Sequence, residues 1–206
     1  MKKIIALIGN KRAWKDYTFS ILQTINPFIE FKRFAFADIL KREYIANYNF
    51  NLAFEFESDE SDELTLEKLE QDKESHRKWL QSWGDYRRKD NSNYFTDNTL
   101  SEIKKSFETE DIEIAVVTDC RFQNEQSELI QFAFKNNIEL IFVKINNPNC
   151  SVDSHISESQ VAWLFANYTL VNEYNKDYKY LVHKNLSKEI EWLALDSLKY
   201  TNFNAL

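Results

Sequence analysis

Three short apolar runs, each bounded by polar residues, limit the folds open to this chain of 206 residues more than any other feature. They cover residues 4–8, 113–118 and 139–143. Each run is short for a buried helix but long enough for a strand that is buried on both faces. Two weaker strand candidates, residues 32–36 and 179–182, would bring the sheet to five strands.

Segments with apolar residues at helical spacing lie between and after these runs. They are residues 15–25, 37–47, 64–83, 122–136 and 186–200. Strands that alternate with helices predict an α/β fold, a doubly wound sheet of about five parallel strands with helices on both faces. The length fits a single domain, residues 1–206, with an acidic insertion at residues 55–63 and a lid-like segment at residues 146–159.

The net charge of −7 argues against general binding to nucleic acid or to an anionic membrane, although a local basic pocket can still hold a phosphorylated small molecule. No apolar run approaches the roughly 20 residues that span a bilayer. The two cysteines, Cys120 and Cys150, have no spacing typical of zinc ligands or of a disulfide framework. We therefore expect a soluble protein of a reducing compartment, the cytoplasm.

One of the two glycines of the chain, Gly9, begins a segment with the spacing of a phosphate-binding loop. The segment follows the GxxxxGK pattern except at its second glycine, and it runs Gly9-Asn10-Lys11-Arg12-Ala13-Trp14-Lys15-Asp16-Tyr17. In such a loop, backbone N–H groups and the start of the next helix face the phosphates, and the lysine reaches their oxygens. These residues are candidates for binding ATP, but the segment alone fits a strand–turn–helix connection with basic residues equally well.

Trp14 replaces the glycine that lets such a loop adopt a positive φ and lets phosphate come close. A non-glycine residue in that conformation costs about 1–2 kcal/mol, and the indole adds bulk. The ring must turn away from the phosphates or fill their place. A Trp14→Gly substitution should raise ATP affinity about tenfold, or roughly 1.4 kcal/mol, if the ring blocks the loop, and should change it little if the ring points away.

Three further segments follow the loop at distances that match a known family. They are Phe36-Ala37-Asp38-Ile39-Leu40-Lys41, residues 77–88 with Gly84, Arg87 and Arg88, and Thr118-Asp119-Cys120-Arg121-Phe122-Gln123-Asn124-Glu125. Together with the loop they resemble the deoxynucleoside monophosphate kinases of bacteriophages, whose pattern runs GxxxxGKDT, FAxxLK, a leucine-glutamine segment with glycine and arginine, and DxRFxNE. The resemblance extends from Lys3 to about Leu186, and it is shared more distantly with animal phosphomevalonate kinases.

The resemblance implies a P-loop kinase that transfers the γ-phosphoryl group of ATP to a (deoxy)nucleoside monophosphate, with Mg²⁺ bridging the phosphates. It implies Lys15, Asp119 and Arg121 as catalytic residues, and Asp16 and Asp119 as supports for Mg²⁺. The residues that it implies at the acceptor are Asp38, Lys41, Arg87, Arg88, Arg121 and Glu125.

Several of these residues also have structural interpretations, which stay open. Asp119 could cap the helix that follows it, and Glu125 could be a structural partner of Arg121. Asp38 and Lys41, one helical turn apart, could form a simple surface pair. The two arginines at positions 87 and 88 could be a solvated basic patch that balances the acidic run.

Two classes of function remain open. One is the kinase. The other is an inactive kinase-fold homologue that acts as a binding or structural protein, as a homodimer or with a phage or host protein in the host cytoplasm. Trp14 favours the inactive homologue, whereas the retained Lys15, Asp16, Asp119 and Arg121 favour the kinase. The similarity to phosphomevalonate kinases also leaves open a different small phosphorylated acceptor.

Overall fold

The computed structural model describes residues 2–55, 64–149, 156–173, 177–187 and 190. The chain forms two compact units. The single domain over residues 1–206 stays a prediction. Unit 1 comprises Met1–Phe34 and Leu100–Leu206, and unit 2 comprises Ala35–Thr99. The predicted acidic insertion lies outside the described residues apart from its first position, and the predicted lid-like segment is described only at its two ends.

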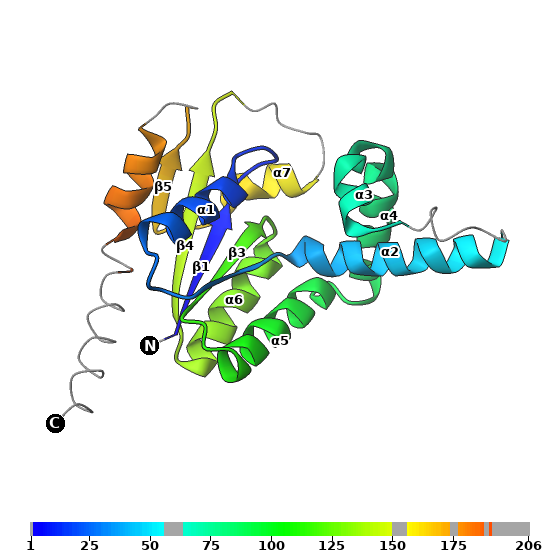
Figure 1. Cartoon of the computed structure of the whole chain (residues 1–206), viewed down its shortest axis with the longest axis horizontal. Coiled ribbons are helices and arrows are strands. Elements are labelled where there is room, and N and C mark those ends of the chain that lie inside the picture. Colours follow the sequence, from blue (N-terminus) through cyan, green and yellow to red (C-terminus); the bar gives the residue numbers. More distant parts are fainter. Residues whose placement is uncertain (1, 56–63, 150–155, 174–176, 188–189, 191–206) are drawn as a thin grey trace. The chain divides into compact units, whose positions relative to one another are not determined.

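Unit 1 is built on a sheet of five strands in the order β2-β3-β1-β4-β5 (Figure 1). The strands are β1 (Lys3–Ile8), β2 (Phe31–Phe34), β3 (Ile114–Cys120), β4 (Glu139–Asn146) and β5 (Tyr168–Val171). All neighbouring strands run parallel. Because β1 is central, the chain leaves it toward β2 on one side and later passes to β4 on its other side. In such sheets the crevice at the carboxyl end of this strand is the usual place for a ligand.

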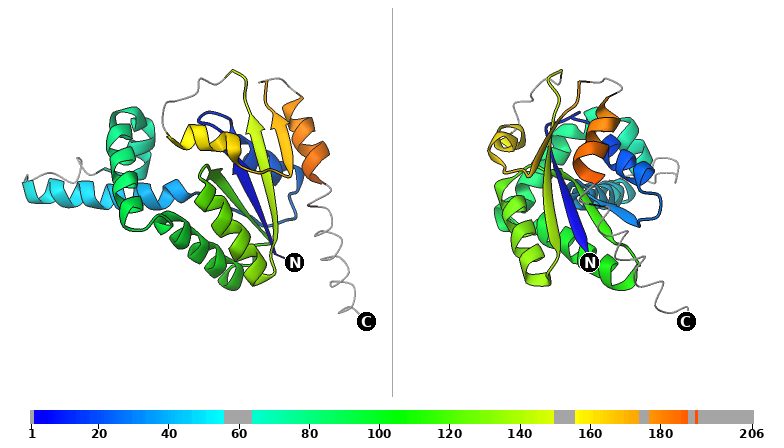
Figure 2. Two further views of the ribbon diagram at one scale, coloured as in Figure 1. Left: turned by 180° about the vertical axis from the view of Figure 1, so that it is seen from behind. Right: turned by 90° about the vertical axis from the view of Figure 1, so that its left-hand side faces the viewer.

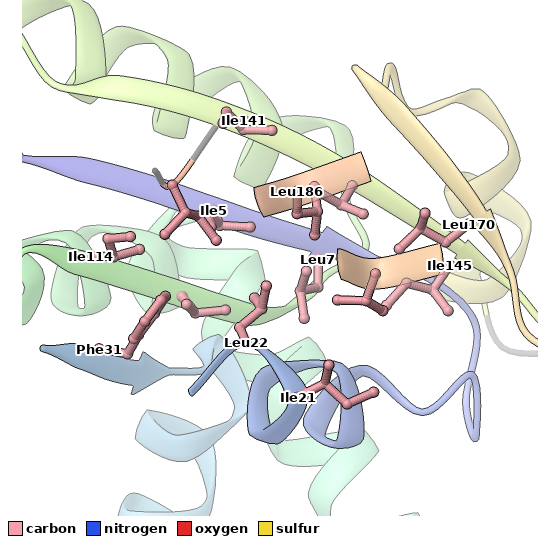
Figure 3. Packing of buried hydrophobic residues seen from close by; sticks show 14 of the residues in the cluster. Ile5, Leu7, Ile21, Leu22, Phe31, Ile114, Ile141, Ile145, Leu170 and Leu186 are labelled. Atoms are coloured by element: carbon pink, nitrogen blue, oxygen red, sulfur yellow. The ribbon is translucent and has the colours of Figure 1, made fainter. Parts of the chain in front are cut away.

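Helices cover both faces of the sheet, as Figure 2 shows for α1 (Lys15–Ile25) on one side and α6 (Gln123–Asn136) on the other. The apolar side chains of β1 are therefore buried whichever way they point, and residues 4–8 are completely inaccessible to solvent. On the face of α1, Ile5 and Leu7 pack with Ile21 and Leu22 in the main core (Figure 3). The predicted doubly wound α/β fold is confirmed.

The fifth strand is wrongly placed by the sequence analysis. Residues 179–182, predicted as a strand, belong to a helical segment over residues 178–187, and β5 lies earlier at Tyr168–Val171. Tyr178, Val182 and Leu186 recur at helical spacing and are all buried in the main core. A short apolar run can be a strand or one face of a helix, and here the helical period decides.

Unit 2 is helical, and its elements are α2 (Phe36–Glu55), α3 (Leu66–Gln71), α4 (Lys73–Asp90) and the first part of α5 (Tyr94–Thr109). The predicted helix at residues 64–83 is thus two helices, and the sequence analysis missed α5. Leu64, Leu69 and Leu80 form the small core of this unit. Within the described ranges, none of the helices is both long and apolar enough to span a bilayer. The remaining helical elements are α7 (Ile156–Gln160) and the 3-10 helix η2 (Val161–Trp163) of unit 1.

Candidate phosphate-binding site

The predicted phosphate loop connects the carboxyl end of the central strand β1 to the first residue of α1. Its first residue, Gly9, lies against the neighbouring strand β4. A Cβ atom on Gly9 would stand only 2.8 Å from the carbonyl oxygen of Ile145, which is backbone and cannot easily move. Gly9 is therefore required by the close approach of the loop to β4 and not by a positive φ.

The sign of φ alternates along the backbone of the loop. Arg12 and Trp14 have φ values of 61° and 68°, whereas Ala13 between them does not lie in the positive region. Such alternation turns successive N–H groups toward one side and makes a concave anion site. The Ala13 N–H donates to the Asn10 carbonyl at 3.2 Å, and the Arg12 carbonyl accepts a long bond of 3.5 Å from Asn147.

Trp14 adopts the left-handed conformation that the replaced glycine would favour, with φ 68° and ψ 37°. Its ring stands edge-on to the ring of Tyr17, with 5.0 Å between the ring centroids, and 41% of the residue is exposed. The indole is thus held against the first turn of α1. A non-glycine residue in this conformation costs about 1–2 kcal/mol.

A chain of hydroxyl groups fixes the start of α1. The Thr18 hydroxyl donates to the Trp14 carbonyl at 3.0 Å and lies 2.6 Å from the hydroxyl of Tyr178, in the helical segment over residues 178–187. Burial raises the pKa of Tyr178 to about 12, against the opposing effect of the bond to Thr18. The phenol keeps its proton at neutral pH. Because the hydroxyl hydrogen of Thr18 is directed to Trp14, Tyr178 is the donor to Thr18, and this bond ties the end of the loop to the helical segment over residues 178–187.

Lys15 folds back onto the loop. Its ammonium group donates to the carbonyl oxygens of Gly9 at 2.9 Å and Asn10 at 2.8 Å, and only 7% of the residue is exposed. These two bonds hold the ammonium group at the carboxyl end of β1, beside the loop backbone. A phosphate there would offer the ammonium charged acceptors, which form stronger bonds than carbonyl groups do.

Asn10 carries an unexplained polar atom at this loop. Its side-chain Oδ1 is buried and makes no hydrogen bond within the part of the chain that the structure describes. A buried polar atom without a partner is uncommon and calls for a water or a ligand group. This atom is a hydrogen-bond acceptor and calls for a donor such as a water, whereas Lys15 and the alternating backbone make the loop fit an anionic ligand such as the phosphates of ATP.

The two residues predicted to support Mg²⁺ have different surroundings. Asp16 is exposed and accepts a hydrogen bond from Arg33 of β2, with 2.9 Å between Oδ1 and Nε. Asp119 is half-buried near the end of β3, beside the fully buried Cys120. The described residues contain no group of three or more metal-ligating side chains. One or two carboxylates suffice for Mg²⁺ when phosphates complete its shell, so the residues fit such an ion.

Glu125 organises the backbone at Arg121. Its carboxylate is buried and accepts the N–H groups of Arg121 at 2.7 Å and Phe122 at 3.0 Å, at the start of α6. Glu125 thus belongs to the cap of α6, which begins within the DxRFxNE segment. Burial raises the pKa of the Cys120 thiol well above its ordinary range, and the nearby Glu125 and Asp119 add to this, so Cys120 stays protonated.

In unit 2, Lys41 forms the predicted pair with Asp38 and a second ion pair with Glu70. Its ammonium lies 3.3 Å from Asp38 and 2.7 Å from Glu70 of α3, and the residue is 9% exposed. Burial disfavours its charge, but the two carboxylates outweigh this and raise the pKa of Lys41. Lys41 thus joins α2 to α3.

The two arginines near the end of α4, Arg87 and Arg88, have different partners. Arg88 lies over the ring of Phe95 and next to Gly84, where a Cβ would stand 2.9 Å from Arg88 Nη1. Arg87 instead donates through Nε to Glu43 of α2 at 3.0 Å. Sequence analysis did not single out Glu43, because a lone glutamate within a long amphipathic helix has no motif to mark it.

A five-stranded parallel sheet covered by helices on both faces, with such a loop between its central strand and the next helix, defines a P-loop kinase-like α/β fold. No family model and no curated protein matches the sequence. Solved structures with a similar outline include an APS kinase mutant from Mycobacterium tuberculosis, with 8% identity and a TM-score of 0.43 over 94% of this chain and 97% of that one. Another is shikimate kinase from Aquifex aeolicus, with 16% identity and a TM-score of 0.44 over 93% of this chain and 98% of that one.

A third is TT1252 from Thermus thermophilus, with 11% identity and a TM-score of 0.47 over 93% of this chain and 98% of that one. These are resemblances of general outline at low identity.

Proposed function

We propose that the protein is an ATP-dependent nucleoside monophosphate kinase of the kind found in bacteriophages. The observation that carries the proposal is the position of Lys15. Its buried ammonium group is held by two loop carbonyls beside a backbone of alternating hand, which is the arrangement needed to receive the β- and γ-phosphates.

The residues of this chain would act by position and charge. Lys15 and the loop N–H groups bind and orient the phosphates, and the start of α1 adds positive potential. Bound Mg²⁺ would neutralise charge on the phosphate oxygens, supported by Asp16 and Asp119. For Asp16 to do so, its carboxylate must leave Arg33. For the acceptor, the proposal keeps Arg121 of unit 1 and Asp38 and Arg87 of unit 2.

The alternative of an inactive homologue rests on Trp14. Trp14 supports this alternative less strongly because it adopts the left-handed backbone conformation expected of the replaced glycine. Its indole also lies against Tyr17. A loop released from binding phosphate would have no reason to keep two residues in this strained region. We therefore favour the enzyme.

Titration calorimetry with ATP and Mg²⁺, followed by a turnover assay with the four deoxynucleoside monophosphates, tests the proposal. We expect saturable ATP binding and ADP formation that depends on at least one monophosphate. No binding at millimolar nucleotide, in a protein shown to be folded by circular dichroism, would exclude the kinase. Binding of ATP without turnover for any monophosphate would support a different phosphorylated acceptor.

A further inference from the structure

Arg87 is held more firmly than a surface arginine usually is. Its Nε donates to Glu43 Oε2 at 3.0 Å, and its guanidinium lies 5.2 Å from the ring of Trp83 and 5.0 Å from the ring of Tyr94. An ion pair and two cation–π contacts thus act on one planar group. Arg87 is one third exposed, so this arrangement lies near the surface of unit 2.

Glu43 is the centre of this cluster. Besides Arg87, its carboxylate accepts the indole N–H of Trp83 at 3.2 Å and the hydroxyl of Tyr94. The bond to Glu43, burial and the carboxylate charge raise the pKa of Tyr94, so its hydroxyl keeps its proton and remains a donor. One carboxylate therefore connects α2 with α4 and with the first residue of α5.

The bonding of Arg87 uses only part of its donor set. An arginine carries five N–H donors in a rigid plane. Among the described residues, the hydrogen bonds of Arg87 are made by Nε alone, which leaves those on Nη1 and Nη2 for another acceptor. Arg77, on the same helix, instead donates through both Nε and Nη2 to Glu74.

We propose that Glu43 is a positioning residue, which together with Trp83 and Tyr94 fixes Arg87 so that Nη1 and Nη2 receive the phosphate of the monophosphate acceptor. The identity of this anion rests on the proposed function. Two parallel N–H groups match two oxygens of a phosphate monoester, and a side chain that is already ordered loses little freedom when it binds. A lysine at this place would be a point charge without such geometry.

Binding of deoxynucleoside monophosphates to the full-length protein, measured by calorimetry without ATP, tests this proposal. The probes are the four monophosphates and the matching deoxynucleosides, which lack the phosphate. Arg87→Lys should weaken monophosphate binding by about 10- to 100-fold, the effect of losing charge-assisted hydrogen bonds, and should leave nucleoside binding unchanged. Arg77→Lys, the matched control on the same helix, should change neither.

Glu43→Gln keeps the shape of the side chain but removes its charge, and it should weaken monophosphate binding by about 3- to 10-fold. In the Arg87→Lys background the same change should have less than about a twofold effect, because a positioning residue acts through its partner. If Glu43 had only a structural role, Glu43→Gln would instead lower the melting temperature and weaken the binding of nucleosides as much as that of monophosphates. If Glu43→Gln does not fold, Tyr94→Phe, which removes one donor to Glu43 and keeps the ring, should give a smaller weakening in the same direction.

Equal monophosphate affinity in folded wild type and Arg87→Lys, or no monophosphate binding at millimolar concentration, would overturn this proposal. ATP affinity, measured on the same proteins, should not change. ATP binding and turnover that do not depend on Arg87 would therefore remove this role and leave the proposed function in place. Monophosphate binding that depends on Arg87 and Glu43, in a protein that does not bind ATP, would support the positioning role and remove the kinase.

Discussion

We propose that both the predicted phosphate loop of unit 1 and the Glu43–Arg87 cluster of unit 2 bind anions, but they are made from different parts of the chain. The loop is made largely of backbone, with alternating dihedral angles at Arg12 and Trp14 and carbonyls that hold Lys15. The cluster is made of side chains on three helices, connected by one carboxylate.

This difference explains why the loop withstands a substitution at its most restrictive position. Backbone N–H groups are present whatever the side chain is, so Trp14 can replace glycine at the expense of strain as long as its ring finds another place. A cluster of side chains has no such tolerance, because each member supplies a donor or acceptor that the others need. For its contact with the phosphates, the loop should therefore depend on its backbone and mainly on one side chain, Lys15.

The largest expected effect is that of Lys15→Ala. No other side chain is placed by the loop to meet the β- and γ-phosphate oxygens, so turnover should fall by at least about 10²- to 10³-fold. A coupled assay for ADP measures this, with Lys104→Ala, an exposed residue paired with Glu108 on α5, as the control. Turnover that persists in folded Lys15→Ala would mean that the phosphate site lies elsewhere and that the contrast with unit 2 fails.

The next effect concerns Glu125, where a side chain supports a backbone segment of unit 1. Glu125→Ala leaves the N–H groups of Arg121 and Phe122 without their acceptor, and we expect the free energy of unfolding to fall by about 2 kcal/mol. Urea denaturation measures it. Gln131→Ala, at an exposed position of the same helix, should change stability by less than about 0.5 kcal/mol. A similar small loss for both variants would show that the cap contributes little.

The fold could be predicted largely from the sequence because its strands are buried on both faces. Continuous apolar runs such as residues 4–8 and 139–143 have no other simple interpretation when helical patterns separate them. The predicted strand at residues 179–182 failed for the opposite reason. Its apolar residues are one face of a helix whose period becomes visible only when Tyr178 and Leu186 are included.

How much of the candidate site could be predicted from the sequence also differs between the loop and the side-chain cluster. The loop could be located from the sequence because consecutive residues build it, and its positive φ at position 14 follows from the glycine that Trp14 replaces. The role of Glu43 could not be found, since its partners Trp83, Arg87 and Tyr94 lie about 40 to 50 positions away and meet only through helix packing. Glu125 is an intermediate case. Its capping bonds are local in the sequence and could be anticipated, but its place in a family motif also made it a candidate site residue.

Two substitutions of Trp14 together isolate the strain of the loop. Both Trp14→Ala and Trp14→Gly lose the contact with Tyr17, but only glycine relieves the left-handed backbone. After allowing for the greater freedom of glycine in the unfolded chain, the glycine variant should be more stable than the alanine variant by about 1 kcal/mol. Urea denaturation of the pair measures this difference.

The same two variants decide where the indole lies when nucleotide binds. Because the ring already rests against Tyr17, the ATP affinity of both variants should remain well within tenfold, or about 1.4 kcal/mol, of the wild-type value. A rise of tenfold or more in the glycine variant would show that the indole blocks the loop. The backbone site would then be less tolerant than the contrast with unit 2 requires.

The smallest expected effect is a dependence of stability on pH. Unit 2, which is held partly by side-chain charges, should show it, whereas the backbone loop of unit 1 should not. In unit 2, burial favours the neutral form of Glu70, but its bond to Lys41 outweighs this and lowers the pKa of Glu70 from its ordinary value of 4.5. The pair thus stabilises unit 2 fully above about pH 4.5, and this contribution is lost as the pH falls through the lower folded-state pKa. Since Glu70 is 43% exposed, solvent screening limits the contribution to less than about 1 kcal/mol. Urea denaturation of wild type and Glu70→Gln should show a small difference at pH 7 that disappears toward pH 3, whereas a difference that persists there would mean that packing and not charge joins α2 to α3.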